Sequence, residues 1–171
     1  MAATYELITK TTVGSSVSSV TLSGIPATYI DLVLKCTVKT SDANVRDLLI
    51  KPNNDGSTTY YGVRTLANGS NDTASITSAD SVLRIENSAS GTAQGATNYG
   101  QAEVYFYEYA ASVQKLITAF GSSEAADTTA YLSYNALAWR DTNSITSLNI
   151  SCSVGNVLAG STFFLYGITE A

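Results

Sequence analysis

The sequence predicts an all-β fold, a single-domain antiparallel sandwich of two sheets with jelly-roll-like topology. Apolar and polar residues alternate with a period of two from one end of the chain to the other, which is typical of half-buried strands. Clusters of Asn, Asp and Gly interrupt this alternation at intervals of about 8 to 14 residues, as they do in sandwiches and barrels. A closed barrel is therefore the alternative architecture.

The expected strands follow one another closely along the chain. They cover residues 4–9, 16–22, 29–37, 47–50, 60–66, 82–86, 101–109, 115–120, 129–137, 145–152 and 162–168. Residues 68–79 and 87–99 have the weakest pattern, and we expect them to form exposed loops. Residues 110–116 and 122–127 resemble helical turns, but neither segment is long enough for a helix.

Length and composition indicate one globular domain spanning residues 1–171. The 171 residues are 44% hydrophobic and 13% charged, without repeats, heptads or a linker. Residues 1–10 lack the pattern of a secretory signal, and no apolar run is long enough to span a membrane. We therefore expect synthesis in the cytoplasm and no membrane partner. Cys36 and Cys152 alternate with apolar residues, so we expect two buried thiols.

Composition argues against an enzyme and against nucleic-acid binding. The chain has no histidine, which removes the commonest general base and the commonest metal ligand. Its net charge of −5 is unsuited to binding phosphates. Glu103 and Glu108 lie an odd number of positions apart, on opposite faces of one expected strand, so they cannot form an acid/base pair. Residues 53–56, Asn-Asn-Asp-Gly, predict a tight turn rather than a calcium loop. We expect no catalytic, metal or cofactor site.

Two surface features indicate that part of this protein is covered by a partner. The polar faces of the strands carry Ser, Thr, Asn and Tyr where soluble sheets usually carry Lys and Glu, which favours a homo-oligomer. In addition, alternation places Tyr105, Tyr107 and Tyr109 on one face, opposite Val104 and Phe106. These three tyrosines form the candidate interface, for a protein or for a stacked glycan. A tyrosine ladder within the sheet is the alternative.

Four segments carry a family resemblance. They are TYELITK (4–10), GIPATYIDLVLKC (24–36), AWRDTNSITSLNIS (138–151) and AGSTFFLYGI (159–168). Together they resemble small virion structural proteins of tailed bacteriophages, including phages of cyanobacteria, whereas residues 53–99 match poorly. The motifs are strands and turns, and members of this group are described as head-associated or tail-fibre-associated. The resemblance therefore implies a virion component.

Two functions follow as expectations. The first is a capsid decoration, or cement, protein: a homotrimer on the outer head surface that binds the major capsid protein or other virion proteins and is assembled in the bacterial cytoplasm. Acidic charge, the charge-poor sheet face and the absence of a stalk favour it. The alternative is a tail-fibre, baseplate or receptor-binding module whose loops 68–79 and 87–99, with the tyrosines, contact a host glycan. Residues 1–10 could pair within their own sheet or swap onto a neighbour.

Overall fold

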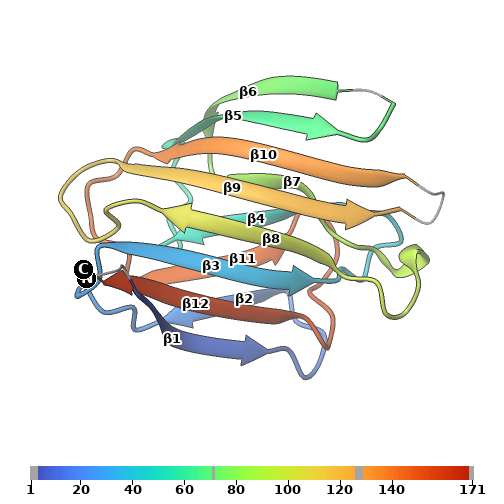
Figure 1. Ribbon diagram of the computed structural model, residues 1–171, viewed down its shortest axis with the longest axis horizontal. Coiled ribbons are helices and arrows are strands. Elements are labelled where there is room, and N and C mark those ends of the chain that lie inside the picture. Colours follow the sequence, from blue (N-terminus) through green and yellow to red (C-terminus); the bar gives the residue numbers. More distant parts are fainter. Residues whose placement is uncertain (1–3, 71, 126–128, 170–171) are drawn as a thin grey trace.

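A computed structural model describes residues 4–70, 72–125 and 129–169, and its regular elements in these ranges are strands and one short 3-10 turn (Figure 1). The elements are β1 (Thr4–Thr12), β2 (Ser19–Ser23), β3 (Asp31–Val38), β4 (Arg46–Pro52), β5 (Tyr60–Ala67), β6 (Asp72–Asp80), β7 (Leu83–Ala89), the 3-10 turn η1 (Thr92–Gln94), β8 (Gly100–Phe106), β9 (Lys115–Glu124), β10 (Ala130–Trp139), β11 (Ser147–Cys152) and β12 (Thr162–Thr169).

The strands form two antiparallel sheets packed face to face, which confirms the sandwich. The larger sheet has eight strands in the order β1-β12-β3-β8-β9-β10-β5-β6 and lies in front in Figure 1. The smaller sheet, of four strands, has the order β2-β11-β4-β7 and lies behind. Every pairing between neighbouring strands is antiparallel.

Jelly-roll topology follows from the nesting of these pairs. β1 pairs with β12, β2 with β11, β3 with β8 and β4 with β7, so the chain folds back on itself as one long nested hairpin. Two further hairpins, β5–β6 and β9–β10, are inserted into this frame. Both join the larger sheet beyond β8, which gives that sheet a broad outer surface.

The core fills the space between the two sheets. Alternate residues of β3, β8 and β12 point inward, and the side chains of Leu34, Val104 and Phe163 are fully buried. Residues of this kind each contribute about 1.5–3 kcal/mol when buried. Cys36 and Cys152 are buried free thiols, as the alternation predicts.

Residues 68–79 are not the exposed loop that the sequence predicts. Most of them form β6, an edge strand that pairs with β5. This strand covers no core, so most of its residues are small and polar and few are apolar. Its sequence therefore lacks the apolar alternation that usually indicates a strand. The prediction of an exposed loop at 87–99 is only partly right, because residues 87–89 complete β7 and only the rest connects β7 to β8. Within this segment Ser88, Ser90 and Gln94 are buried rather than exposed.

Within the single chain, the N-terminal strand pairs at the edge of the larger sheet. β1 pairs with β12 of the same chain, and Thr4 lies opposite Thr169, so the two ends of the described chain are side by side (Figure 1). The predicted turn at residues 53–56 is present, with Asn53 and Asn54 at positive φ. Among the described residues, no helix is long and apolar enough to cross a lipid bilayer.

Candidate functional site

The three predicted interface tyrosines do not share one face. Tyr105 and Tyr107 lie on the outer face of the eight-stranded sheet, with ring centroids 4.4 Å apart. The next residue, Glu108, adopts a φ of 47°, which ends the strand alternation. Tyr109 is consequently 1% exposed and belongs to the core, where its hydroxyl donates a hydrogen bond to the carbonyl of Pro26. The prediction of a three-tyrosine face is therefore wrong for Tyr109.

Asp31 fixes the remaining tyrosine pair against the turn. Its Oδ2 accepts a hydrogen bond of 2.7 Å from the Tyr105 hydroxyl, and its Oδ1 accepts one of 2.7 Å from the Glu108 amide. Burial and the hydrogen bond to Asp31 raise the pKa of the Tyr105 hydroxyl. Tyr105 is therefore held in one orientation as a neutral donor, whereas Tyr107 is 40% exposed.

The outer face of the eight-stranded sheet carries an apolar patch over the two inserted hairpins. We use this term for the outward residues Tyr61, Val63, Ile76, Leu116, Leu132, Tyr134, Ala136 and Ala138. Cross-strand pairing brings them together, since Val63 lies opposite both Ile76 and Ala136, and Leu116 opposite Ala138. Ile76 is 82% exposed and Leu116 is 64% exposed. A shallow hollow of about 360 Å³ lies among these side chains.

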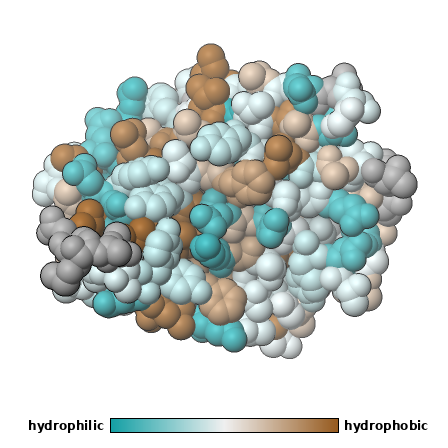
Figure 2. All heavy atoms as spheres, viewed as in Figure 1, coloured by the Kyte–Doolittle hydropathy of each residue, from teal (hydrophilic) through white to brown (hydrophobic). Residues whose placement is uncertain are grey.

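Charge is nearly absent from this part of the surface. Outward positions of β5 and β10 carry no charged residue. Arg140 lies at the margin, where its guanidinium sits 3.9 Å from the centre of the Tyr61 ring. Figure 2 shows apolar and weakly polar side chains over much of this face, with strongly hydrophilic residues in separate groups. Contiguous exposed apolar surface of this kind marks interaction sites in soluble proteins.

Sequence reasoning missed the apolar patch because both faces of its strands are rich in apolar residues. In β9, Leu116 and Phe120 alternate with Ile117 and Ala119, so the pattern does not say which set is buried. In the structure Ile117 and Ala119 face the core together with Lys115, whose buried ammonium donates to the carbonyls of residues 111 and 142, and Leu116 and Phe120 face outward. Apolar residues on both faces of a strand in an antiparallel sheet are the signal that could have revealed the patch.

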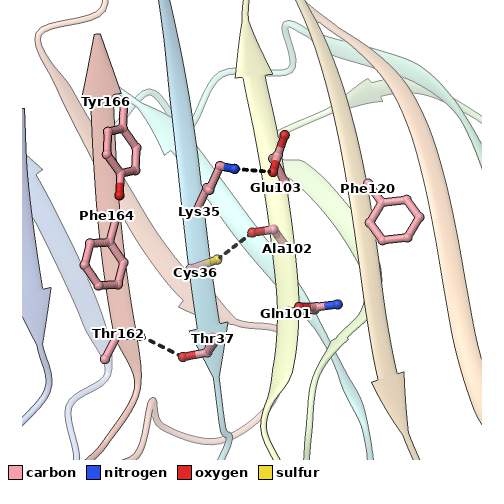
Figure 3. A pocket seen from close by; sticks show the side chains of 10 residues that line it. All are labelled: Lys35, Cys36, Thr37, Gln101, Ala102, Glu103, Phe120, Thr162, Phe164 and Tyr166. Atoms are coloured by element: carbon pink, nitrogen blue, oxygen red, sulfur yellow. Dashed lines mark hydrogen bonds and ion pairs between the residues drawn. The ribbon is translucent and has the colours of Figure 1, made fainter. Parts of the chain in front are cut away.

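A second feature, the aromatic hollow, lies over β12, β3, β8 and β9 on the same outer face. It is an open depression of about 510 Å³ (Figure 3). Its side walls are aromatic: Phe164 and Tyr166 project from β12, and Phe120 projects from β9 on the opposite side. The Phe164 and Tyr166 rings are nearly parallel, with centroids 6.5 Å apart and planes at 12°.

The floor of the aromatic hollow is polar and its charges are paired. Lys35 Nζ lies 3.0 Å from Glu103 Oε2, and this hydrogen bond raises the pKa of the Lys35 ammonium. Both side chains are about half exposed. The hydroxyls of Thr37 and Thr162 are 2.7 Å apart, and Gln101 completes the floor. Hydrogen-bonding groups therefore lie between two apolar walls.

A smaller hollow of about 210 Å³ adjoins the first. Phe120 and Glu103 border both hollows, and Tyr105, Thr118 and Tyr134 complete the second. Phe120 is 39% exposed. The two hollows together form an elongated track across the strands, with the Phe120 ring standing between them.

The acidic residues singled out in the sequence do not form a catalytic pair. Glu103 is engaged with Lys35, and Glu108 belongs to the turn held by Asp31. Among the described residues, no group of three or more His, Cys, Asp or Glu side chains is placed to hold a metal ion. Asp55, in the predicted turn, accepts hydrogen bonds from Trp139, Ser57 and Thr59 and so has a structural position.

Comparisons with known proteins do not identify a family. No family model matches the chain, and no curated protein matches its sequence. A galectin from Caenorhabditis elegans is 8% identical at a TM-score of 0.34, over 94% of this chain and 96% of the galectin. A protein of unknown function from Shewanella oneidensis MR-1 is 14% identical at a TM-score of 0.29, over 98% of this chain and 77% of that protein. An alginate lyase from a Chlorella virus is 6% identical at a TM-score of 0.25, over 95% of this chain and 88% of the lyase. Similarities this weak carry no functional argument.

Proposed function

We propose that this protein is a structural component of a bacteriophage virion, a capsid decoration protein that associates through the apolar patch. One observation carries the proposal: an uncharged, largely apolar surface, formed by two hairpins added to a complete jelly roll, is exposed on the isolated chain. The eight strands of the nested frame make up the jelly-roll topology, and the inner faces of the added hairpins contribute Tyr60, Ile117 and Trp139 to the core. The added hairpins extend one sheet and bring Leu116, Val63 and Ile76 to the surface.

The chemistry of the apolar patch favours a second copy of this chain as its occupant. Permanent interfaces between identical subunits are more apolar than transient ones and are depleted in charge at their centre. A standard interface covers about 800 Å² on each partner. That is about one tenth of the 7903 Å² of accessible surface, so an oligomer formed here leaves most of the molecule free. We propose a homotrimer, in keeping with closed symmetric assembly.

Net charge and sequence resemblance support placement on the outside of a phage head. A net charge of −5 is unfavourable next to packaged DNA and tolerable on the outer surface. The resemblance of residues 4–10, 24–36, 138–151 and 159–168 to virion structural proteins covers most of β1, β3, β11 and β12, four strands of the nested frame. The poorly matched residues 53–99 include the β5–β6 hairpin, which supplies part of the apolar patch.

Immunogold electron microscopy of intact phage particles tests the location. An antibody against the purified protein should place gold over the whole head. Gold confined to the tail or its tip would contradict decoration and favour the adsorption role. A particle without label before and after opening with detergent would contradict a virion role altogether.

A further inference from the structure

We infer that the aromatic hollow and its smaller neighbour form a binding site for an uncharged oligosaccharide. The site lies on the outer face over β12, β3, β8 and β9 and reaches β10 at Tyr134, so it adjoins the apolar patch at its margin. The walls, the floor and the charges of the two hollows support such a site whether or not the protein is a virion component.

The walls provide apolar ring surfaces on two sides of a polar floor. A pyranose ring has one or two apolar C–H faces and a rim of hydroxyls, so it needs an aromatic surface and hydrogen-bonding partners close to each other. Phe164 and Tyr166 form one such surface and Phe120 the other. Between them, Thr37, Gln101 and Thr162 present hydroxyl and amide groups that both donate and accept.

The charges of the floor compensate each other, which favours an uncharged ligand. Lys35 and Glu103 form an ion pair across neighbouring strands, and each is about half exposed, so unused donors and acceptors still face the hollow. Lys10 lies over the Phe164 ring, with its ammonium 5.2 Å from the ring centre, but it does not line the hollow. A charged ligand would have to break the ion pair between Lys35 and Glu103, whereas an uncharged one leaves it intact.

An extended peptide does not fit the same place by strand addition. β3 and β8 are each paired on both sides, so neither offers free backbone groups to a peptide strand. An oligosaccharide needs side-chain contacts alone. The combined hollows, at about 510 Å³ and 210 Å³, are of the size that small-ligand sites have in proteins, and their track shape suits several linked sugar rings.

Saturation-transfer NMR and isothermal titration with the purified full chain test the site. The probes are cellohexaose, maltohexaose, chitohexaose and mannohexaose, each at millimolar concentration. We expect at least one to bind and Phe120→Ala to weaken that binding about tenfold or more. Phe120→Tyr, which keeps an aromatic plane, should retain it. Val154→Ala is the control, because Val154 is 45% exposed but lines neither hollow, and it should bind as the wild type does.

Two results would overturn the inference: no hexasaccharide binds the wild-type protein, or Phe120→Ala and Val154→Ala bind equally well. Thermal unfolding of each variant verifies that the fold is intact, and Phe164→Ala provides a second, independent variant in the opposite wall. Immunogold labelling reports on the virion role separately, so a negative sugar titration leaves the proposed function standing, and an unlabelled particle leaves the sugar site standing.

Discussion

The indole N–H of Trp139 donates a 2.8 Å hydrogen bond to Asp55 Oδ2 and thereby joins the end of β10 to the turn between β4 and β5. The same carboxylate accepts hydrogen bonds from the Ser57 amide and from the hydroxyls of Ser57 and Thr59. This turn leads into β5, whose outward residues belong to the apolar patch. Asp55 therefore stabilises the base of the hairpin that carries part of the proposed interface.

Acid should lower the free energy of unfolding by protonating Asp55. Burial by itself would raise the pKa of this carboxyl, but the hydrogen bonds from Ser57, Trp139 and Thr59 outweigh it and lower the pKa from 3.8 to about 2. A lowered pKa in the folded state stabilises the protein above pH 4, and this contribution is lost as the pH falls to about 2.

Substitution of Asp55 should remove that dependence. In urea unfolding above pH 4, the free energy of unfolding of Asp55→Asn should be about 1–3 kcal/mol lower than that of the wild type, because the donors of Trp139 and Ser57 lose a charged acceptor. The difference between the two proteins should shrink toward pH 2. Asp72→Asn, at an exposed carboxylate, is the control and should leave the free energy of unfolding nearly unchanged. A difference in free energy of unfolding between wild type and Asp55→Asn that stays constant at every pH would contradict the lowered pKa of Asp55.

The position of Tyr109 in the core predicts a contrast between neighbouring tyrosines. Tyr109→Phe removes the hydroxyl that binds the Pro26 carbonyl in a buried place, and we expect it to lower the free energy of unfolding by about 1–2 kcal/mol. Tyr107→Phe, on the exposed face, should change it by less than about 0.5 kcal/mol. Equal effects in chemical denaturation would argue against the different burial of the two rings.

The apolar patch should control self-association. Sedimentation velocity of the wild-type protein should show concentration-dependent trimers, whereas Leu116→Lys places a charge in the proposed interface and should yield monomers at the same concentrations. Val154→Lys is the matched control, since Val154 is 45% exposed outside the patch, and it should assemble normally. Because Leu116 is exposed in the monomer, unfolding temperatures measured at high dilution should be similar for all three proteins. A trimer that persists in Leu116→Lys would refute this role of the patch.

Both thiols should be unreactive in the native protein. Burial raises the pKa of Cys36 to about 12 and that of Cys152 to about 11, so neither forms the reactive thiolate at mildly alkaline pH. Ellman's reagent should therefore detect no thiol until denaturant is added, and then both. Rapid reaction of one cysteine in the native state would show that its strand opens.

The sequence predicts the frame of this protein well because its inner strands have one buried and one polar face. β3 and β11 follow this rule, and their boundaries match the alternation closely. The rule fails where a strand covers no core, as in β6, and where the backbone leaves the strand conformation, as at Glu108. A single residue at positive φ moved Tyr109 from the expected face to the interior.

The two surface sites were harder to predict because they depend on the order of strands in the sheet. Phe120 and Phe164 are separated in sequence and become opposite walls only because β12, β3, β8 and β9 are consecutive neighbours. Periodicity assigns a face to each residue but does not say which strands are adjacent. The apolar patch has the same origin, since β5 and β10 belong to separate insertions.

Hydroxyl-radical footprinting of purified phage particles, compared with the free protein at high dilution, tests the central claim most directly. We predict that the protein is present in the particles and that Val63, Ile76, Leu116 and Leu132 are protected there. Val113 and Val154, which are 43% and 45% exposed outside the apolar patch, should remain reactive. Particles that lack the protein, or a patch as reactive in the particle as in the free chain, would contradict the claim.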